Sequence, residues 1–90
     1  MIHVIEGCEY SPLIANFIET LSALDSKRLF ELNVWLTGYA TPFTFDNTCE
    51  YDFANEGVRI INGNFEIWYI FYDRIDFMKI NVEEELMKNE

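Results

Sequence analysis

The sequence predicts an α+β fold. One N-terminal amphipathic helix is expected to pack on a curved, mainly antiparallel sheet of four to six strands, either open or closed into a small barrel. Two observations predict this fold. Apolar residues recur at helical spacing in one early segment, and much of the remaining chain alternates apolar and polar residues as strands do. Because the strands follow a single helix instead of alternating with helices, the order is typical of α+β proteins.

The helix is expected from about Pro12 to Asp25. Ser11 is a suitable N-cap, since its hydroxyl can accept a hydrogen bond from a free amide of the first turn, and proline suits the first helical position. The expected buried stripe has three-to-four spacing and comprises Leu13, Ile14, Phe17, Ile18, Leu21 and Leu24. This helix would cover one face of the sheet.

Strands are expected on both sides of the helix. The clearest is 29–39, where Phe30, Leu32, Val34 and Leu36 alternate with more polar residues. In 48–53, Cys49, Tyr51 and Phe53 fall on one side in the same way. The other expected strands lie within 1–6, within 41–45, where Pro42 favours an edge position, and over 75–82.

The segment Val58–Tyr72 contains two apolar runs joined by Asn62-Gly63, which is the strongest short signal for a β-hairpin. A two-residue type I′ turn needs positive φ at both central residues, which glycine adopts freely and asparagine tolerates. With Asn62 and Gly63 as the loop, Arg59 faces Glu66, so opposite charges lie across from one another.

That register divides the hairpin into two faces. The expected core face comprises Val58, Ile60, Phe65, Ile67, Tyr69 and Phe71, and the other face comprises Arg59, Ile61, Glu66, Trp68, Ile70 and Tyr72. The second face is polar near the turn and apolar further along. Because large exposed apolar patches are uncommon on monomers, we expect the chain itself, or a partner, to cover Trp68, Ile70 and Tyr72.

The chain of 90 residues is expected to form a single domain, 1–90, with 83–90 as an acidic C-terminal tail. No run approaches the about 18–20 apolar residues of a membrane span, and the first residues lack the basic start of a signal peptide. We therefore expect a cytoplasmic protein without a membrane partner.

The charge of the chain restricts its partners. Sixteen acidic residues against six basic ones give a net charge of −10. Such a surface repels phosphate backbones, so direct binding to nucleic acid is not expected, whereas association with a basic protein is favoured. The alternative is that the charge only keeps an aromatic-rich small protein in solution.

No catalytic, metal or cofactor site is expected. His3 is the only histidine, and neither Cys8 nor Cys49 has the spacing of a zinc site or a nucleophilic triad. The carboxylate pairs, such as Glu50 with Asp52, lack the pattern of a calcium loop. A small enzyme or metal protein built on the histidine and the cysteines is therefore a minor alternative, and both thiols are expected to be buried and reduced.

We expect a small acidic, non-enzymatic binding protein that docks on a basic surface of a protein partner. Inhibitors of defence nucleases, of the kind that phages encode, and immunity proteins of nuclease toxins have this composition, and their carboxylates take the place of nucleic-acid phosphates. The candidate partner-binding residues are Asp46, Glu50, Asp52, Glu66, Trp68, Tyr72, Asp73, Asp76, Glu83, Glu84 and Glu85.

The alternative is a self-associating structural or assembly module. In it, the aromatic sheet face with Trp68, Ile70 and Tyr72, or an open edge strand near Pro42, would be buried between copies. Negative charge opposes this homo-oligomer without forbidding it.

Overall fold

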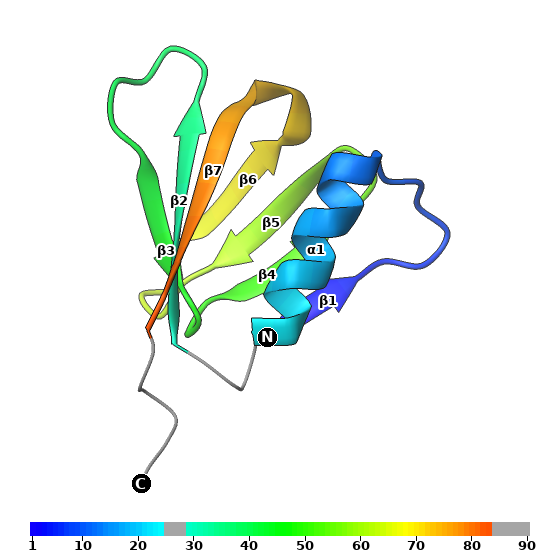
Figure 1. Cartoon of the computed structure of the whole chain (residues 1–90), viewed down its shortest axis with the longest axis horizontal. Helices are drawn as coiled ribbons and strands as arrows, with labels where there is room; N and C mark the ends of the chain where they lie inside the picture. The colour runs from blue at the N-terminus through cyan, green and yellow to red at the C-terminus, as the bar shows by residue number, and fades with distance from the viewer. Residues whose placement is uncertain (25–28, 84–90) are drawn as a thin grey trace, which may run out of the picture.

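The computed structural model of the chain describes residues 1–24 and 29–83. These residues form one α-helix and seven strands, which confirms the α+β fold (Figure 1). The elements in order are β1 (Ile2–Val4), α1 (Pro12–Leu24), β2 (Phe30–Leu36), β3 (Phe43–Asp46), β4 (Glu50–Phe53), β5 (Gly57–Ile61), β6 (Ile67–Phe71), a 3-10 turn η1 (Tyr72–Arg74) and β7 (Ile75–Val82).

The strands form two sheets. The first has the order β1-β4-β5-β6, with β1 parallel to β4 and the other pairs antiparallel. The second has the order β3-β2-β7 and is antiparallel throughout. The ladders remain separate, so the closed-barrel form of the prediction is wrong for the described residues. The chain passes from the first sheet to the second through η1, between β6 and β7.

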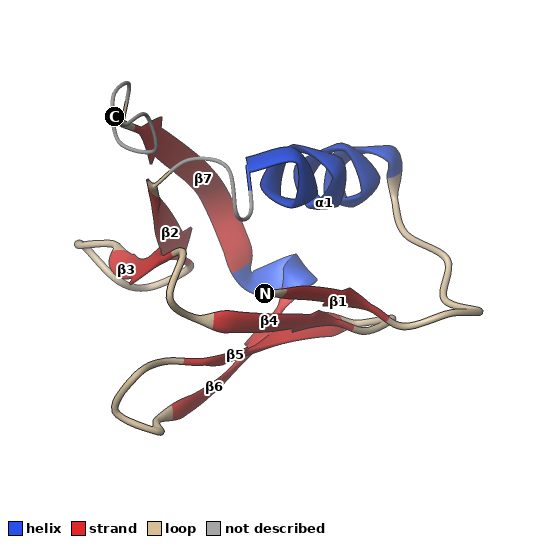
Figure 2. Ribbon diagram, turned by 90° about the horizontal axis from the view of Figure 1, so that it is seen from below, coloured by secondary structure: helices blue, strands red, loops and turns tan. Residues whose placement is uncertain are grey.

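The helix α1 lies over the inner face of the four-stranded sheet, with the three-stranded sheet along one side of the core (Figure 2). The Ser11 hydroxyl accepts a hydrogen bond from the amide of Ile14 at 3.3 Å, as expected of an N-cap. Ile14, Ile18 and Leu21 are buried in the core. Leu13 was expected in the same stripe but is exposed, because it precedes Ile14 by one residue and so projects about 100° away from it.

The inner faces of the two sheets meet below the helix. The alternation predicted for β2 and β4 is confirmed, because Phe30, Leu32 and Val34 are buried from one sheet and Tyr51 and Phe53 from the other. At the open side of the core, the ring of Trp68 on β6 contacts two rings of β3, with centroid distances of 5.2 Å to Phe43 and 5.7 Å to Phe45. Side chains therefore bridge the two ladders where main-chain pairing does not.

The hairpin register predicted from Asn62-Gly63 is wrong. Ile61 pairs with Ile67, so the loop is longer than two residues. The amide of Phe65 donates to the carbonyl of Asn62 at 3.0 Å, and Phe65 has a φ of 63°. This is the three-residue loop in which a type I turn is followed by one left-handed residue. Gly63 takes no left-handed φ, so the glycine does not occupy the position that the sequence pattern assigned to it.

Two features of the loop and core explain the longer register. The side-chain oxygen of Asn62 accepts hydrogen bonds from the amides of Asn64 at 2.9 Å and Glu66 at 3.1 Å. In addition, this register places Trp68 and Ile70 opposite Ile60 and Val58, so that all four contribute to the core. Core packing therefore determines which face of β6 is buried.

The described part of the chain ends just after β7. The amide of Glu83 donates to the carbonyl of Leu29 at 3.0 Å and extends the pairing of β7 with β2. The remainder of the predicted acidic tail, 84–90, and the predicted last helical residue, Asp25, lie outside the described residues. Within those residues, no helix is long and apolar enough to cross a membrane.

Candidate functional site

The outer face of the four-stranded sheet carries exposed apolar side chains on β6. Because the register shifts by an odd number of residues, Ile67, Tyr69 and Phe71 turn away from the core. Their exposed fractions are 54%, 70% and 57%. A sheet face in contact with water normally carries polar residues, so this row is unusual for a small protein.

The register correction changes the role of two candidate residues. Trp68 and Tyr72 were expected on a face that needs a cover, and the chain itself covers them, since both are half-buried against the core. The hydroxyl of Tyr72 donates a hydrogen bond to the carbonyl of Ala54 at 2.6 Å. Burial raises the pKa of this phenol. The aromatic side chains that meet water on this sheet are instead Tyr69 and Phe71, which the sequence pattern placed in the core.

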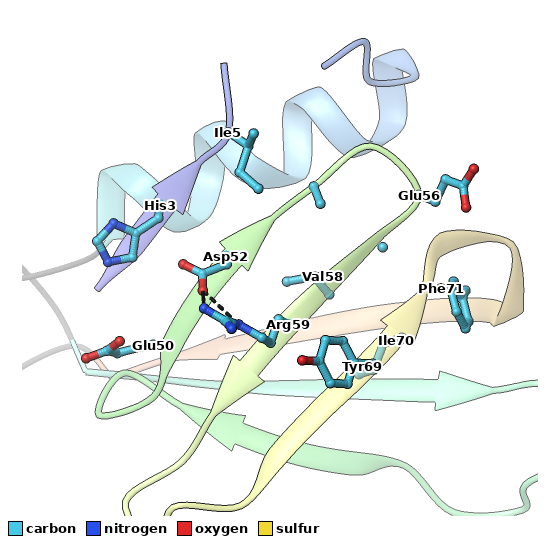
Figure 3. Close-up of a pocket in the computed structure, with 12 residues that line it drawn as sticks. His3, Ile5, Glu50, Asp52, Glu56, Val58, Arg59, Tyr69, Ile70 and Phe71 are labelled. Carbon is cyan, nitrogen blue, oxygen red and sulfur yellow. Dashed lines mark hydrogen bonds and ion pairs between the residues drawn. The ribbon is translucent and has the colours of Figure 1, made fainter. Parts of the chain in front are cut away.

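A row of polar side chains crosses this face from β1 to β6. The pairings place His3 beside Asp52, Asp52 beside Arg59, and Arg59 beside Tyr69, and Figure 3 shows the four side chains following one another. The guanidinium of Arg59 forms an ion pair with Asp52, and its Nε donates to the same carboxylate at 3.0 Å. This hydrogen bonding raises the pKa of Arg59, so the cation stays charged at any physiological pH.

The polar row and the apolar row border a shallow hollow of about 770 Å³ on the outer face. Its lining includes three carboxylates, Glu50, Asp52 and Glu56, and the apolar side chains of Ile5 and Phe71. Figure 3 shows Glu50 and Glu56 at opposite ends of the hollow. The Asp52 carboxylate is neutralised by Arg59, whereas Glu50 and Glu56 leave the rim of the hollow negative.

The other candidate carboxylates are spread over the surface. Asp46 accepts hydrogen bonds from the amide and hydroxyl of Thr48, which stabilises the turn after β3. Glu66 accepts a hydrogen bond from the side-chain amide of Asn62 in the hairpin loop. The remaining positions are Asp73 in η1, Asp76 on β7 and Glu83 after β7, whereas Glu84 and Glu85 lie outside the described residues.

The structure thus brings Glu50 and Asp52 together on the outer face, as the strand alternation predicted. It adds Glu56, Tyr69 and Phe71, which sequence reasoning did not select. Glu56 lies between the segments expected as strands, 48–53 and Val58–Tyr72, so the strand pattern assigned it to no face. The other two were assigned to the wrong face, because alternation alone fixes which residues share a face but not which face is buried.

The alternative of a small enzyme or metal protein depends on His3 and the two cysteines. No three His, Cys, Asp or Glu side chains among them lie close enough to hold a metal ion. Cys8 and Cys49 are free thiols; Cys49 is buried, while Cys8 is half-buried. Burial raises the pKa of the Cys49 thiol, which disfavours the reactive thiolate. The lining of the hollow includes His3 but no serine, threonine or cysteine.

Comparisons with protein families, with curated proteins and with solved structures found no significant match to this chain. The features that bear on function are therefore those of the surface itself: an apolar row, a polar row and a negative rim on one sheet face.

Proposed function

We propose that this chain is a non-enzymatic binding protein that docks the outer face of its four-stranded sheet onto a basic surface of a protein partner in the cytoplasm. The observation that carries the proposal is the exposure of Tyr69 and Phe71 on a sheet face whose rim is negative. Tyrosine is among the residues that dominate the binding energy of protein interfaces, and large apolar side chains anchor them.

Charge and shape support a basic partner. The net charge of −10 accelerates encounter with a positively charged surface, and the free carboxylates of Glu50 and Glu56 would pair with lysine or arginine around the apolar contact. A regular sheet also holds these side chains in place before binding, which lowers the entropy cost of association.

The partner class that fits best is a nucleic-acid-binding protein, such as a nuclease. Its basic groove would accept the carboxylates in place of phosphates, so the chain would act as an inhibitor or immunity protein of the kind used against defence nucleases or nuclease toxins. Direct binding to nucleic acid is disfavoured by the same charge.

The test is affinity capture with the immobilised chain at low and high salt, followed by identification of the captured protein and a binding measurement with the purified partner. We expect a protein with a basic surface whose affinity falls as salt rises. Capture that is unchanged between the two salt concentrations would contradict the proposal.

Matched variants locate the surface. Tyr69→Ser with Phe71→Ser should abolish binding, because both side chains lie on the outer face. Tyr39→Ser is the control, since Tyr39 is similarly exposed but lies after β2, outside the lining of the hollow. Equal loss of binding in the control would show that the outer face has no special role.

A second candidate function is self-association, and one observation favours it. The strand β6 is the last of its ladder, and its sequence, Ile67–Phe71, contains no charge, proline or glycine to protect it. Two copies could bury this strand against each other. Light scattering distinguishes the two functions, because a monomer at all concentrations would contradict self-association and leave the docking proposal intact.

A further inference from the structure

A groove separates α1 from β7 on the side of the fold opposite β6. It has a volume of about 490 Å³ and is lined by residues of both elements, including Leu13 and Phe17 from α1 and Met78 and Ile80 from β7. Figure 2 shows the helix and the strand standing apart along this side. The lining is mainly apolar, so the groove exposes hydrophobic surface that the described chain does not cover.

The strand β7 presents an unpaired main-chain edge to this groove. It is the last strand of the order β3-β2-β7, so within the described residues no strand lies on its other side. The bond from the amide of Glu83 to the carbonyl of Leu29 fixes which residues face β2. Because hydrogen-bonded and non-hydrogen-bonded pairs alternate in an antiparallel ladder, Phe77, Lys79 and Asn81 bond to β2.

The main-chain groups of Met78 and Ile80 therefore point toward the groove. No hydrogen bond joins either main chain to α1. Since side chains alternate with the main-chain direction along a strand, Met78 and Ile80 also turn their side chains toward the core beneath α1. The main-chain donors and acceptors of Met78 and Ile80 thus border a groove whose floor consists of apolar side chains and whose opposite side is α1.

We propose that an extended segment of a partner protein binds in this groove as an additional strand on β7. Strand addition satisfies the main-chain groups of Met78 and Ile80, and it places alternate side chains of the segment over the apolar floor. Apolar residues are required at those alternate positions, because the floor contains Phe17 and Ile80.

We expect basic residues at the intervening positions of the segment, whose side chains turn to the solvent side of β7. Lys79 is exposed on that side, whereas Asp76 lines the groove and no lysine or arginine does. The chain as a whole carries −10, so it attracts a basic segment and repels an acidic one. This site lies on a different sheet from the outer face described above, and its occupancy does not depend on that face.

Amide hydrogen exchange followed by NMR tests the proposal with a synthetic peptide of four Lys-Val repeats. In the free protein, the amides of Met78 and Ile80 should exchange faster than that of Lys79, which bonds to β2. Peptide at about ten times its dissociation constant should slow exchange at Met78 and Ile80 about tenfold. Absence of binding, or binding without protection of these two amides, would overturn the proposal.

Two further peptides separate strand addition from attraction by charge alone. A peptide of Lys-Ser repeats retains the charge without the apolar side chains, and a Glu-Val peptide retains the apolar side chains with opposite charge. Both should bind at least about tenfold more weakly than the Lys-Val peptide. Equal protection of Met78 and Ile80 by the Lys-Ser peptide would overturn the apolar part of the proposal, and equal protection by the Glu-Val peptide would overturn the basic part.

A pair of variants on α1 provides the structural control. Asn16 is exposed and lines the groove, so Asn16→Trp should fill it and weaken binding of the Lys-Val peptide about tenfold. Ser22 is exposed on the same helix outside the groove lining and carries no charge, so Ser22→Trp should leave the affinity unchanged. Equal affinity of the two variants would place the peptide elsewhere and overturn the assignment.

Discussion

Gly57 is the residue at which the first sheet tolerates no side chain. A Cβ atom there would lie 2.5 Å from the carbonyl oxygen of Ile70 and 3.1 Å from the Cα of Phe71, and both are main-chain atoms that a rotamer change cannot move. Gly57 pairs with Phe71 across the β5–β6 ladder. The absence of a side chain at Gly57 therefore permits the close approach that fixes Phe71 on the outer face.

Gly57→Ala should destabilise the fold by about 1–3 kcal/mol, because the strands must separate to admit the methyl group. Urea unfolding measures the loss. Gly63→Ala is the control, because the added methyl group there meets nothing within 4 Å. Gly7→Ala is unsuitable, since Gly7 has a positive φ. A Gly57→Ala protein as stable as Gly63→Ala would contradict the close packing of β5 on β6.

Tyr72 links η1 to the loop between β4 and β5 through its hydrogen bond to Ala54. Tyr72→Phe removes that bond and should cost about 1 kcal/mol at neutral pH. Tyr39→Phe, which removes a hydroxyl from an exposed tyrosine, is the control and should cost almost nothing.

The same side chain predicts a pH dependence. Burial raises the pKa of Tyr72 in the folded state, so its stabilising contribution is complete below the unfolded value of about 10 and is lost as the pH rises above it. The wild-type protein should therefore lose more unfolding free energy between neutral and strongly alkaline pH than Tyr72→Phe does. Burial also raises the pKa of the Cys49 thiol, so its ionisation destabilises both proteins at alkaline pH. This effect cancels when the two proteins are compared. Parallel pH profiles would contradict the burial of the phenol.

At the scale of elements, the β5–β6 hairpin determines the character of the outer face. Its three-residue loop holds Phe65 at a φ of 63°, a conformation that suits glycine better than a bulky residue, and leaves the side chain exposed. In the shorter loop that Asn62-Gly63 suggests, Phe65 would instead face the core and Gly63 would need a positive φ. In the observed register Phe65 has the positive φ, whereas in the two-residue register Gly63 would have it and Phe65 would be buried.

Substitutions at these positions distinguish the registers. Phe65→Gly should leave stability unchanged or raise it by up to about 1 kcal/mol, because it relieves the left-handed φ. Gly63→Ala should leave the unfolding free energy unchanged or raise it by up to about 1 kcal/mol. In the two-residue register, Phe65→Gly would empty a core position and cost about 3–5 kcal/mol. Thermal unfolding of the two variants decides between these outcomes.

The elements differ in how well the sequence predicted them. The helix and the strands β2, β4 and β7 were predictable, because each has a single apolar face or a clear start signal such as Ser11-Pro12. The faces of β6 were not, because both are apolar and only the loop length decides between them. The shared face of Glu50 and Asp52 was therefore predictable, whereas the exposed aromatic side chains of that face are Tyr69 and Phe71 instead of Trp68 and Tyr72.

For the whole molecule, charge is the dominant property. The net charge of −10 is large for a chain of 90 residues. The lysine and arginine side chains in the described part of the chain are Arg59, Arg74 and Lys79, and Arg59 is paired with Asp52. Repulsion between carboxylates therefore opposes the compact state. The acidity that favours a basic partner is expected to lower the stability of the free protein.

Salt should therefore stabilise the free chain. Raising sodium chloride from about 10 mM to about 150 mM shortens the screening length from about 30 Å to about 8 Å, so the unfolding free energy should rise, by about 1 kcal/mol. Chemical denaturation with urea, which is uncharged, measures the change. A fall in stability with added salt would mean that attractive ion pairs outweigh the repulsion.

If the outer face of the four-stranded sheet contacts a basic protein, as we propose, site-specific photo-crosslinking detects that contact. A photoreactive phenylalanine analogue at Tyr69 would be compared with the same analogue at Tyr39, an exposed aromatic position after β2. We expect a crosslink from position 69 to a protein with a basic surface, absent from position 39 and weakened by salt. Equal crosslinking from the two positions, or crosslinking that salt does not weaken, would contradict it.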